Sequence, residues 1–189
     1  DNFREAWNWA CAERDYELLE SANEALYIFC LLQGRLDDGK ALFERARQNL
    51  APAPGEKPHP VWLSSGIRFY SMADSGDEIS DRLNLALQAA EERDDKFEAA
   101  YCLYNLATLA HFVDQDPARA IDFYQDCAAI YRQLDETYYL AHVLSNLGEA
   151  HQLIGQNDLT VQYIQEAYQL QRQIGDRMGE SETLRAMSM

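Results

Sequence analysis

The side chains in this sequence that could carry chemistry are few, and their spacing matches no catalytic or metal-binding pattern. They are His59, His111, His142 and His151, together with Cys11, Cys30, Cys102 and Cys127. No His-Glu-x-x-His, Cys-x-x-Cys, Gly-x-Ser-x-Gly or phosphate-binding Gly-rich pattern occurs, so the usual residues of zinc, redox, acyl-transfer and nucleotide chemistry are missing. We therefore expect no enzyme, no catalytic residue, no metal and no cofactor. Cys30 and Cys127 are expected to fill packing positions in the core.

Local patterns that suggest a ligand have simpler explanations in packing. His111 and His142 could approach each other on adjacent helices, but no Cys or carboxylate spacing completes a metal site. Asp114 and Asp116 begin like a calcium loop, yet the Gly and the distal Glu of such a loop are missing. We expect a turn and a helix cap there instead. At a helix interface, His151 is expected to be a packed, hydrogen-bonded imidazole.

The charge of the chain limits its partners. Its 189 residues include 32 acidic and 16 basic side chains, which give a net charge of −16. No basic stripe is present to neutralise phosphates, so direct nucleic-acid binding is not expected. No apolar run approaches the roughly 20 residues that span a bilayer, and the first residues lack the order of a signal peptide. We expect a cytoplasmic protein without membrane contact, excised from a longer chain because an initiator Met is missing.

An internal repeat predicts the fold. Residues 100–107 align with residues 141–148 at a shift of 41, and residues 131–134 align with 171–174 at a shift of 40. We assign the one-residue difference to the turn at 114–118. Repeats of this length are typical of stacked supersecondary units, and the sequence therefore predicts an all-α array of helix pairs.

The turn and helix-end residues of each repeat predict two helices joined by a turn. Gly155 suits a left-handed position just after the first helix of the later unit. Asn157 or Asp158 could cap the next helix by accepting a hydrogen bond from its free N–H groups. Pro117 is expected in the first turn of the second helix of the earlier unit, where its missing N–H costs nothing. Asp122 and Asp126, one helical turn apart, are expected to face water.

The spacing of small and large residues resembles the tetratricopeptide repeat, in a variety with longer helices. The matching positions are Leu147, Gly148, Gly155, Ile164 and Ala167, and in the unit before them Leu106, Ala107, Ala120, Tyr124 and Cys127. Small residues let neighbouring helices approach closely, and large ones fill the space between them. The resemblance implies a right-handed alpha-alpha superhelix in which the first helix of each pair lines a concave surface.

The N-terminal part carries a second resemblance, in its first helix and in a later glycine-bounded turn. The helix at 2–10 and the Gly34 to Gly39 turn are similar to the region after the ATPase core in bacterial STAND-type regulators, many of which are transcriptional activators. That resemblance implies a C-terminal helical repeat region that senses an inducer or a partner in signal transduction. The nucleotide-binding loop of such proteins is not in this sequence.

These patterns divide the chain into three regions. They are a degenerate repeat region at 1–50, a Pro-rich connection at 51–60, and tetratricopeptide-like repeats at 61–189, with units at about 61–95, 96–135 and 136–175 and a partial unit at 176–189. Within the first of these units, we expect helices at 61–73 and 79–92 joined by residues 74–77.

The concave surface is the predicted binding groove. Its candidate residues are Tyr101, Tyr104, Asn105, Thr108, His111, Phe112, His142, Ser145, Asn146, Glu149 and Gln152. Aromatic side chains are good anchors when they are accessible, but helical aromatic stripes are also typical of cores, so both interpretations stay open. The expected partner is a protein or peptide, with a small inducer or another domain of the parent chain as further options. The alternative function is a structural module that stacks through its helical ends, with a homodimer as one outcome.

Overall fold

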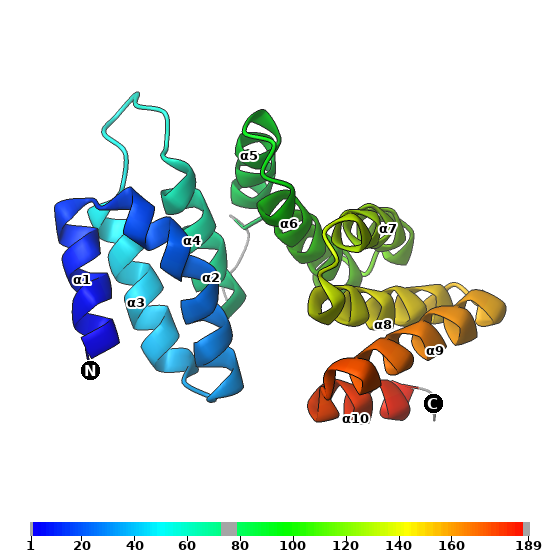
Figure 1. Ribbon diagram of the computed structural model, residues 1–189. Coiled ribbons are helices and arrows are strands. Elements are labelled where there is room, and N and C mark those ends of the chain that lie inside the picture. The colour runs from blue at the N-terminus through cyan, green and yellow to red at the C-terminus, as the bar shows by residue number, and fades with distance from the viewer. Residues whose placement is uncertain (1, 73–78, 187–189) are drawn as a thin grey trace. The chain divides into compact units, whose positions relative to one another are not determined.

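The computed structural model describes residues 2–72 and 79–186 and is all-α over those ranges. Its helices are α1 (Asn2–Glu13), α2 (Tyr16–Leu32), α3 (Leu36–Asn49), α4 (Pro60–Met72), α5 (Ile79–Glu92), α6 (Lys96–Thr108), α7 (Pro117–Gln133), α8 (Thr137–Leu153), α9 (Asn157–Ile174) and α10 (Arg177–Ala186), with a π-helical turn, η1 (Leu109–Val113), directly after α6 (Figure 1). The all-α prediction is confirmed. The predicted joint at 74–77 lies outside the described residues.

The chain forms two compact units, residues 1–89 and 90–189. This division differs from the expected one, which set the boundary at the Pro-rich segment. Residues 51–59 are irregular, as predicted, but α4 beyond them packs on α2 and α3 and so belongs with the N-terminal helices. A connection without regular structure therefore lies within the first unit.

The first unit is a small helical bundle around a core of its own. Helix α1 packs on α2 and α3, and α4 packs on both α2 and α3 (Figure 1). Trp7, Leu26 and Phe43 are buried at its centre. The Trp7 ring meets Phe43 edge to face at 5.6 Å, and its Nε1 donates to the Leu42 carbonyl at 2.9 Å. A buried Trp whose N–H is satisfied in this way adds apolar area without an unpaired polar group.

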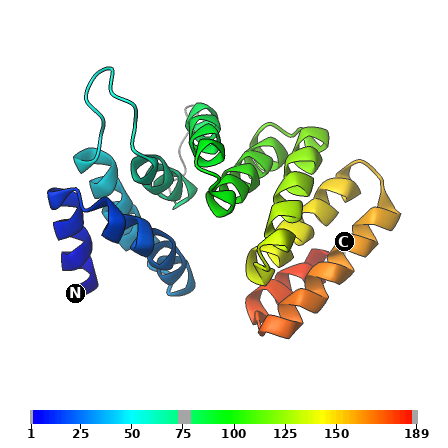
Figure 2. The same ribbon diagram turned by 45° about the horizontal axis from the view of Figure 1, so that its top comes forward.

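The second unit is repeat-like, because each helix packs mainly on its neighbours in sequence. The contacts run from α6 to α7, α8, α9 and α10 in order, and α10 also reaches back to α8 (Figures 1 and 2). Nearest-neighbour packing of this kind is typical of stacked repeat proteins. Cys30 in the first unit and Cys127 in the second are buried, as predicted.

Most of the predicted turn chemistry is confirmed. Asp116 accepts from the Arg119 N–H at 3.1 Å and precedes Pro117 in the first turn of α7. Gly155 has φ of +76°, the left-handed conformation that suits glycine. The capping role of Asn157 or Asp158 is wrong. Helix α9 begins at Asn157 after Gln156, without a side-chain cap. The turn closes one residue before Asn157, where the Gln156 N–H donates to the His151 carbonyl at 3.0 Å.

The one-residue difference between the repeats lies in the π turn, so its assignment to the turn at 114–118 is wrong. Helix α6 has 13 residues and η1 five, one residue more than the 17 of α8. Both helices are then followed by three residues before α7 and α9 begin. The Asp114 N–H donates to the Leu109 carbonyl five residues back, which is the bond of a π-helix. A π turn inserts one residue into a helix without breaking it.

A close approach between α8 and α9 explains the small residue at position 148. A Cβ atom added to Gly148 would lie 2.6 Å from Ile164 Cγ1, well inside van der Waals contact. His151 is also confirmed as a packed imidazole, since its Nδ1 lies 2.6 Å from Gln156 Oε1 and its ring stacks on Tyr163 at 5.3 Å.

Gly148→Ala should lower the free energy of unfolding of the second unit by up to about 2 kcal/mol. Overpacking against Ile164 costs about 1–3 kcal/mol, and the better helix propensity of Ala returns about 1 kcal/mol. The measurement is urea unfolding followed by circular dichroism. Adding Ile164→Ala should couple favourably with Gly148→Ala in a double-mutant cycle. A gain in stability from Gly148→Ala alone would contradict the close approach.

Candidate functional site

A groove of about 830 Å³ lies in the second unit, where η1, α8 and α10 meet. Its lining consists of His111, Phe112, Gln115, Pro117, Glu149, Gln152, Leu153, Glu182 and Arg185. These residues come from η1, α8 and α10, from the turn before α7 and, with Pro117, from the first residue of α7. The groove is within the range of known small-ligand and side-chain pockets.

Two large apolar side chains in the groove remain open to solvent. Phe112 is 55% exposed and Leu153 is 65% exposed. The π turn brings the rings of His111 and Phe112 together, stacked at 4.1 Å and 20°, although successive side chains of an α-helix point about 100° apart. Exposed apolar groups beside polar ones are typical of interaction sites.

The polar side of the groove is dominated by two carboxylates. Glu149 of α8 is half-buried, and Glu182 of α10 is exposed. Burial, and then the Glu182 charge, raise the pKa of Glu149 above its usual value. The carboxylate of Glu149 is thus less stable than one in water. In the described ranges, no ion pair joins either carboxylate to Arg185 or to another cation.

His111 is a buried polar group on the groove wall. It is 5% exposed, and its Nδ1 is sealed from solvent without a hydrogen-bond partner within the described part of the chain. Burial lowers the pKa of His111, so its imidazole is neutral at neutral pH. Its ring also meets Tyr124 of α7 edge to face at 6.1 Å.

The groove contains four of the eleven predicted site residues, namely His111, Phe112, Glu149 and Gln152. Tyr101 is only 3% exposed. Of the two interpretations left open for the aromatic stripe, this burial favours the core for Tyr101. Tyr104 and Asn146 instead link α6 to α8, with Asn146 Nδ2 donating to the Tyr104 hydroxyl at 3.1 Å.

The remaining predicted residues are engaged elsewhere in the unit. Asn105 donates to the Tyr101 carbonyl at 2.8 Å, and Thr108 donates to the Tyr104 carbonyl at 2.9 Å. Ser145 is buried under α10, where its hydroxyl lies 3.1 Å from Thr183 Oγ1.

His142 lies beside the residue that caps α10. Its Nε2 is 3.3 Å from Asp176 Oδ2, while Asp176 Oδ1 accepts from the Gly179 N–H at 3.0 Å. Helix α10 and the turn before it therefore cover the N-terminal half of the predicted surface on α8.

Sequence reasoning missed five groove residues, which are Gln115, Pro117, Leu153, Glu182 and Arg185. Leu153 could have been found, because it ends the apolar pattern of α8 one turn after Glu149. Glu182 and Arg185 lie in the partial repeat, whose first helix occupies the same position as α6 and α8. Applying the repeat period of 40 to 41 residues to α10 would have included them.

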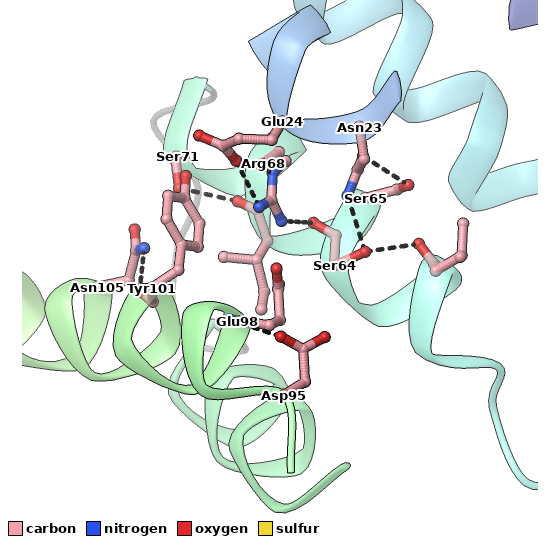
Figure 3. Close-up of polar contacts among 12 residues, drawn as sticks. Asn23, Glu24, Ser64, Ser65, Arg68, Ser71, Asp95, Glu98, Tyr101 and Asn105 are labelled. Carbon is pink, nitrogen blue, oxygen red and sulfur yellow. Dashed lines mark hydrogen bonds and ion pairs between the residues drawn. The ribbon is translucent and has the colours of Figure 1, made fainter. Parts of the chain in front are cut away.

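A second polar cluster, in the first unit, is buried and structural (Figure 3). Arg68 of α4 is 1% exposed, and its Nη2 donates to Glu24 Oε2 at 2.6 Å. Beside it, Asn23 Nδ2 donates to Ser64 Oγ at 2.8 Å, and Ser65 Oγ donates to Asn23 Oδ1 at 3.3 Å. These bonds fix α2 against α4.

Comparisons with known proteins support the fold and go no further. No protein-family model matches the chain, and no curated protein matches it in sequence. Among solved structures, it is similar to BtubC (BKLC) from P. vanneervenii, with a TM-score of 0.65 and 15% sequence identity over 99% of this chain and 82% of that one. In the described ranges, no helix is long and apolar enough to cross a membrane.

Arg68→Ala should destabilise the first unit by about 2 kcal/mol, because it removes the charge-assisted hydrogen bonds of a buried guanidinium to Glu24, whose side chain is 28% exposed. The matched control is Arg4→Ala, which removes an exposed ion pair to Asp38 at 2.7 Å and should cost less than about 1 kcal/mol. Tryptophan fluorescence during urea unfolding reports on this unit alone, since Trp7, Trp9 and Trp62 all lie in it. An equal loss of unfolding free energy in the two variants would contradict the structural role of the Arg68–Glu24 ion pair.

Proposed function

We propose that this chain is a non-catalytic protein-interaction domain that binds a peptide or protein segment in the groove between η1, α8 and α10. The observation that carries the proposal is the exposure of Phe112 and Leu153 inside a groove of about 830 Å³. Other large apolar side chains of the unit, such as Val161 and Met178, are also exposed, but they do not line this groove. An aromatic anchor beside polar groups is the arrangement found at interaction hot spots.

The proposal includes the tetratricopeptide-like architecture. Neighbour-to-neighbour packing, the close Gly148–Ile164 contact and the left-handed Gly155 turn are what such helix pairs require. Similarity to BtubC in fold is compatible with a right-handed superhelix of this type. We further propose that the chain is the sensing region of a larger cytoplasmic regulator of the STAND type, where a partner or an inducer would occupy the groove. That last step rests on the sequence resemblance at 2–10 and 34–39.

A binding role also fits the state of the cysteines. Burial raises the pKa of Cys11 to about 11 and raises the pKa of Cys127 further. A thiol with such a pKa stays protonated at neutral pH and is a poor nucleophile. These cysteines are therefore better explained as core residues than as catalytic groups.

The test is selection of short random peptides on the wild-type chain, followed by measurement of their affinity for variants. Phe112→Ala should weaken the selected peptides at least about tenfold, since loss of a hot-spot aromatic costs more than about 1.4 kcal/mol. The matched control is Val161→Ala on α9, a residue that is 53% exposed and lies outside the groove. Peptides whose affinity is unchanged by both Phe112→Ala and Leu153→Ala would exclude the groove as their binding site.

A second candidate function is self-assembly through the end of the second unit. Ile174, Met178 and Leu184 are large apolar side chains that are exposed near or on α10. A second copy of the chain that packed on these side chains would remove them from water.

A further inference from the structure

The groove has acceptors for positive charge that the chain itself does not use. Glu149 and Glu182 face it from α8 and α10, and their charges interact. Arg185 lies on the same wall, but no ion pair or hydrogen bond joins it to either carboxylate in the described part of the chain. Two neighbouring carboxylates without a cation repel each other, so a bound cation would relieve that repulsion.

His111 is a further polar group on the wall of the groove. A side chain that is 5% exposed and has an unpartnered ring nitrogen departs from the rule that buried polar groups are hydrogen-bonded. Its imidazole is neutral, because burial lowers the pKa of His111. A donor in the groove would reach this nitrogen only after the side chains around it move, so His111 adds a polar group to the wall and does not itself select the ligand.

The dimensions of the groove favour an organic cation over a metal ion. No group of three or more His, Cys, Asp or Glu side chains is close enough to hold a metal within the described residues. The volume of about 830 Å³ greatly exceeds that of a bare ion and matches that of a ligand with several side chains. Apolar surface from Phe112 and Leu153 next to the carboxylates suits a long side chain with an aliphatic stem and a charged end.

We propose that the groove binds a basic peptide segment, with a Lys or Arg side chain held by Glu149 and Glu182 and a neighbouring apolar residue packed on Phe112 and Leu153. This inference rests on the proposed function and specifies the partner. The charged end of the side chain would donate hydrogen bonds to the two carboxylates. Such charge-assisted hydrogen bonds are roughly twice as strong as hydrogen bonds between neutral groups. A guanidinium could also stack on the exposed ring of Phe112.

The groups around Glu149 predict how pH affects this binding. They are Glu182 and Arg185 of α10, His111 of η1 and Tyr124 of α7. Since burial and Glu182 raise the pKa of Glu149, this carboxyl takes up a proton earlier than others as pH falls. A bound cation favours the ionised form. Binding of a basic peptide should therefore weaken as the pH is lowered, beginning at a higher pH than the protonation of an ordinary glutamate would give, and more so in the wild type than after Glu149→Gln.

The experiment is a nuclear magnetic resonance titration of the whole chain with the peptide Gly-Leu-Arg-Leu-Arg-Gly, which detects even weak binding. Two matched peptides carry citrulline or Glu in place of both Arg residues. Citrulline keeps the shape of Arg without its charge. The variant is Glu149→Gln with Glu182→Gln, and its control is Asp122→Asn with Asp126→Asn on α7. Those aspartates are exposed, and the control changes the net charge by the same amount.

The expected result is binding of the Arg peptide at residues 109–115 and 149–153, weakened at least about tenfold in the Glu variant and less than about twofold in the Asp control. Equal weakening in both variants would mean attraction to the net charge of the chain and would overturn the inference. So would equal binding of the citrulline peptide, or no binding of the Arg peptide. If the groove binds the citrulline or Glu peptide in a way that Phe112→Ala abolishes, the proposed function stands and only the cation specificity fails.

Discussion

The close packing of each helix against its neighbours in sequence determines what the second unit can offer a partner. Gly148 gives α8 room to approach Ile164 of α9, and Tyr124 and Cys127 of α7 are buried in the same way. A helix that is covered on two sides exposes only one row of side chains to solvent. On α8, that row is shortened again by α10, which covers Ser145. The open part is the C-terminal half, where Glu149 and Leu153 lie.

The π turn after α6 changes which side chains lie beside the C-terminal end of α8. One extra residue in the helix brings His111 and Phe112 into a stack beside the end of α8. π turns are rare and often occur at functional sites. The groove therefore combines a regular repeat, which leaves carboxylates exposed, with one local irregularity, which exposes an aromatic ring. Elsewhere acidic residues such as Asp122 and Asp126 are simply solvated.

The repeat period and its punctuation were enough to predict the all-α fold, the Pro117 and Gly155 turns and the packing of His151. Periodicity shows which face of a helix is apolar, but it does not show which later helix will cover that face. This is why the sequence left open whether Tyr101 is an accessible anchor, and why it did not predict that Thr183 covers Ser145. The π turn could not be predicted, since its residues have no composition that distinguishes them from an α-helix. Arg68 could have attracted notice as a lone charge in an apolar helix, but its partner Glu24 is 44 residues away.

We propose that the groove, and not the exposed apolar face of α10, is the working surface of this unit. The most direct measurement is light scattering after size exclusion across a wide range of protein concentration, on the wild type and on Met178→Ser with Leu184→Ser. The account predicts a monomer at every concentration for both proteins, with the groove open to a partner. A dimer that grows with concentration and is lost in the variant would contradict it, because association through the exposed apolar residues of α10 would then be the principal interaction.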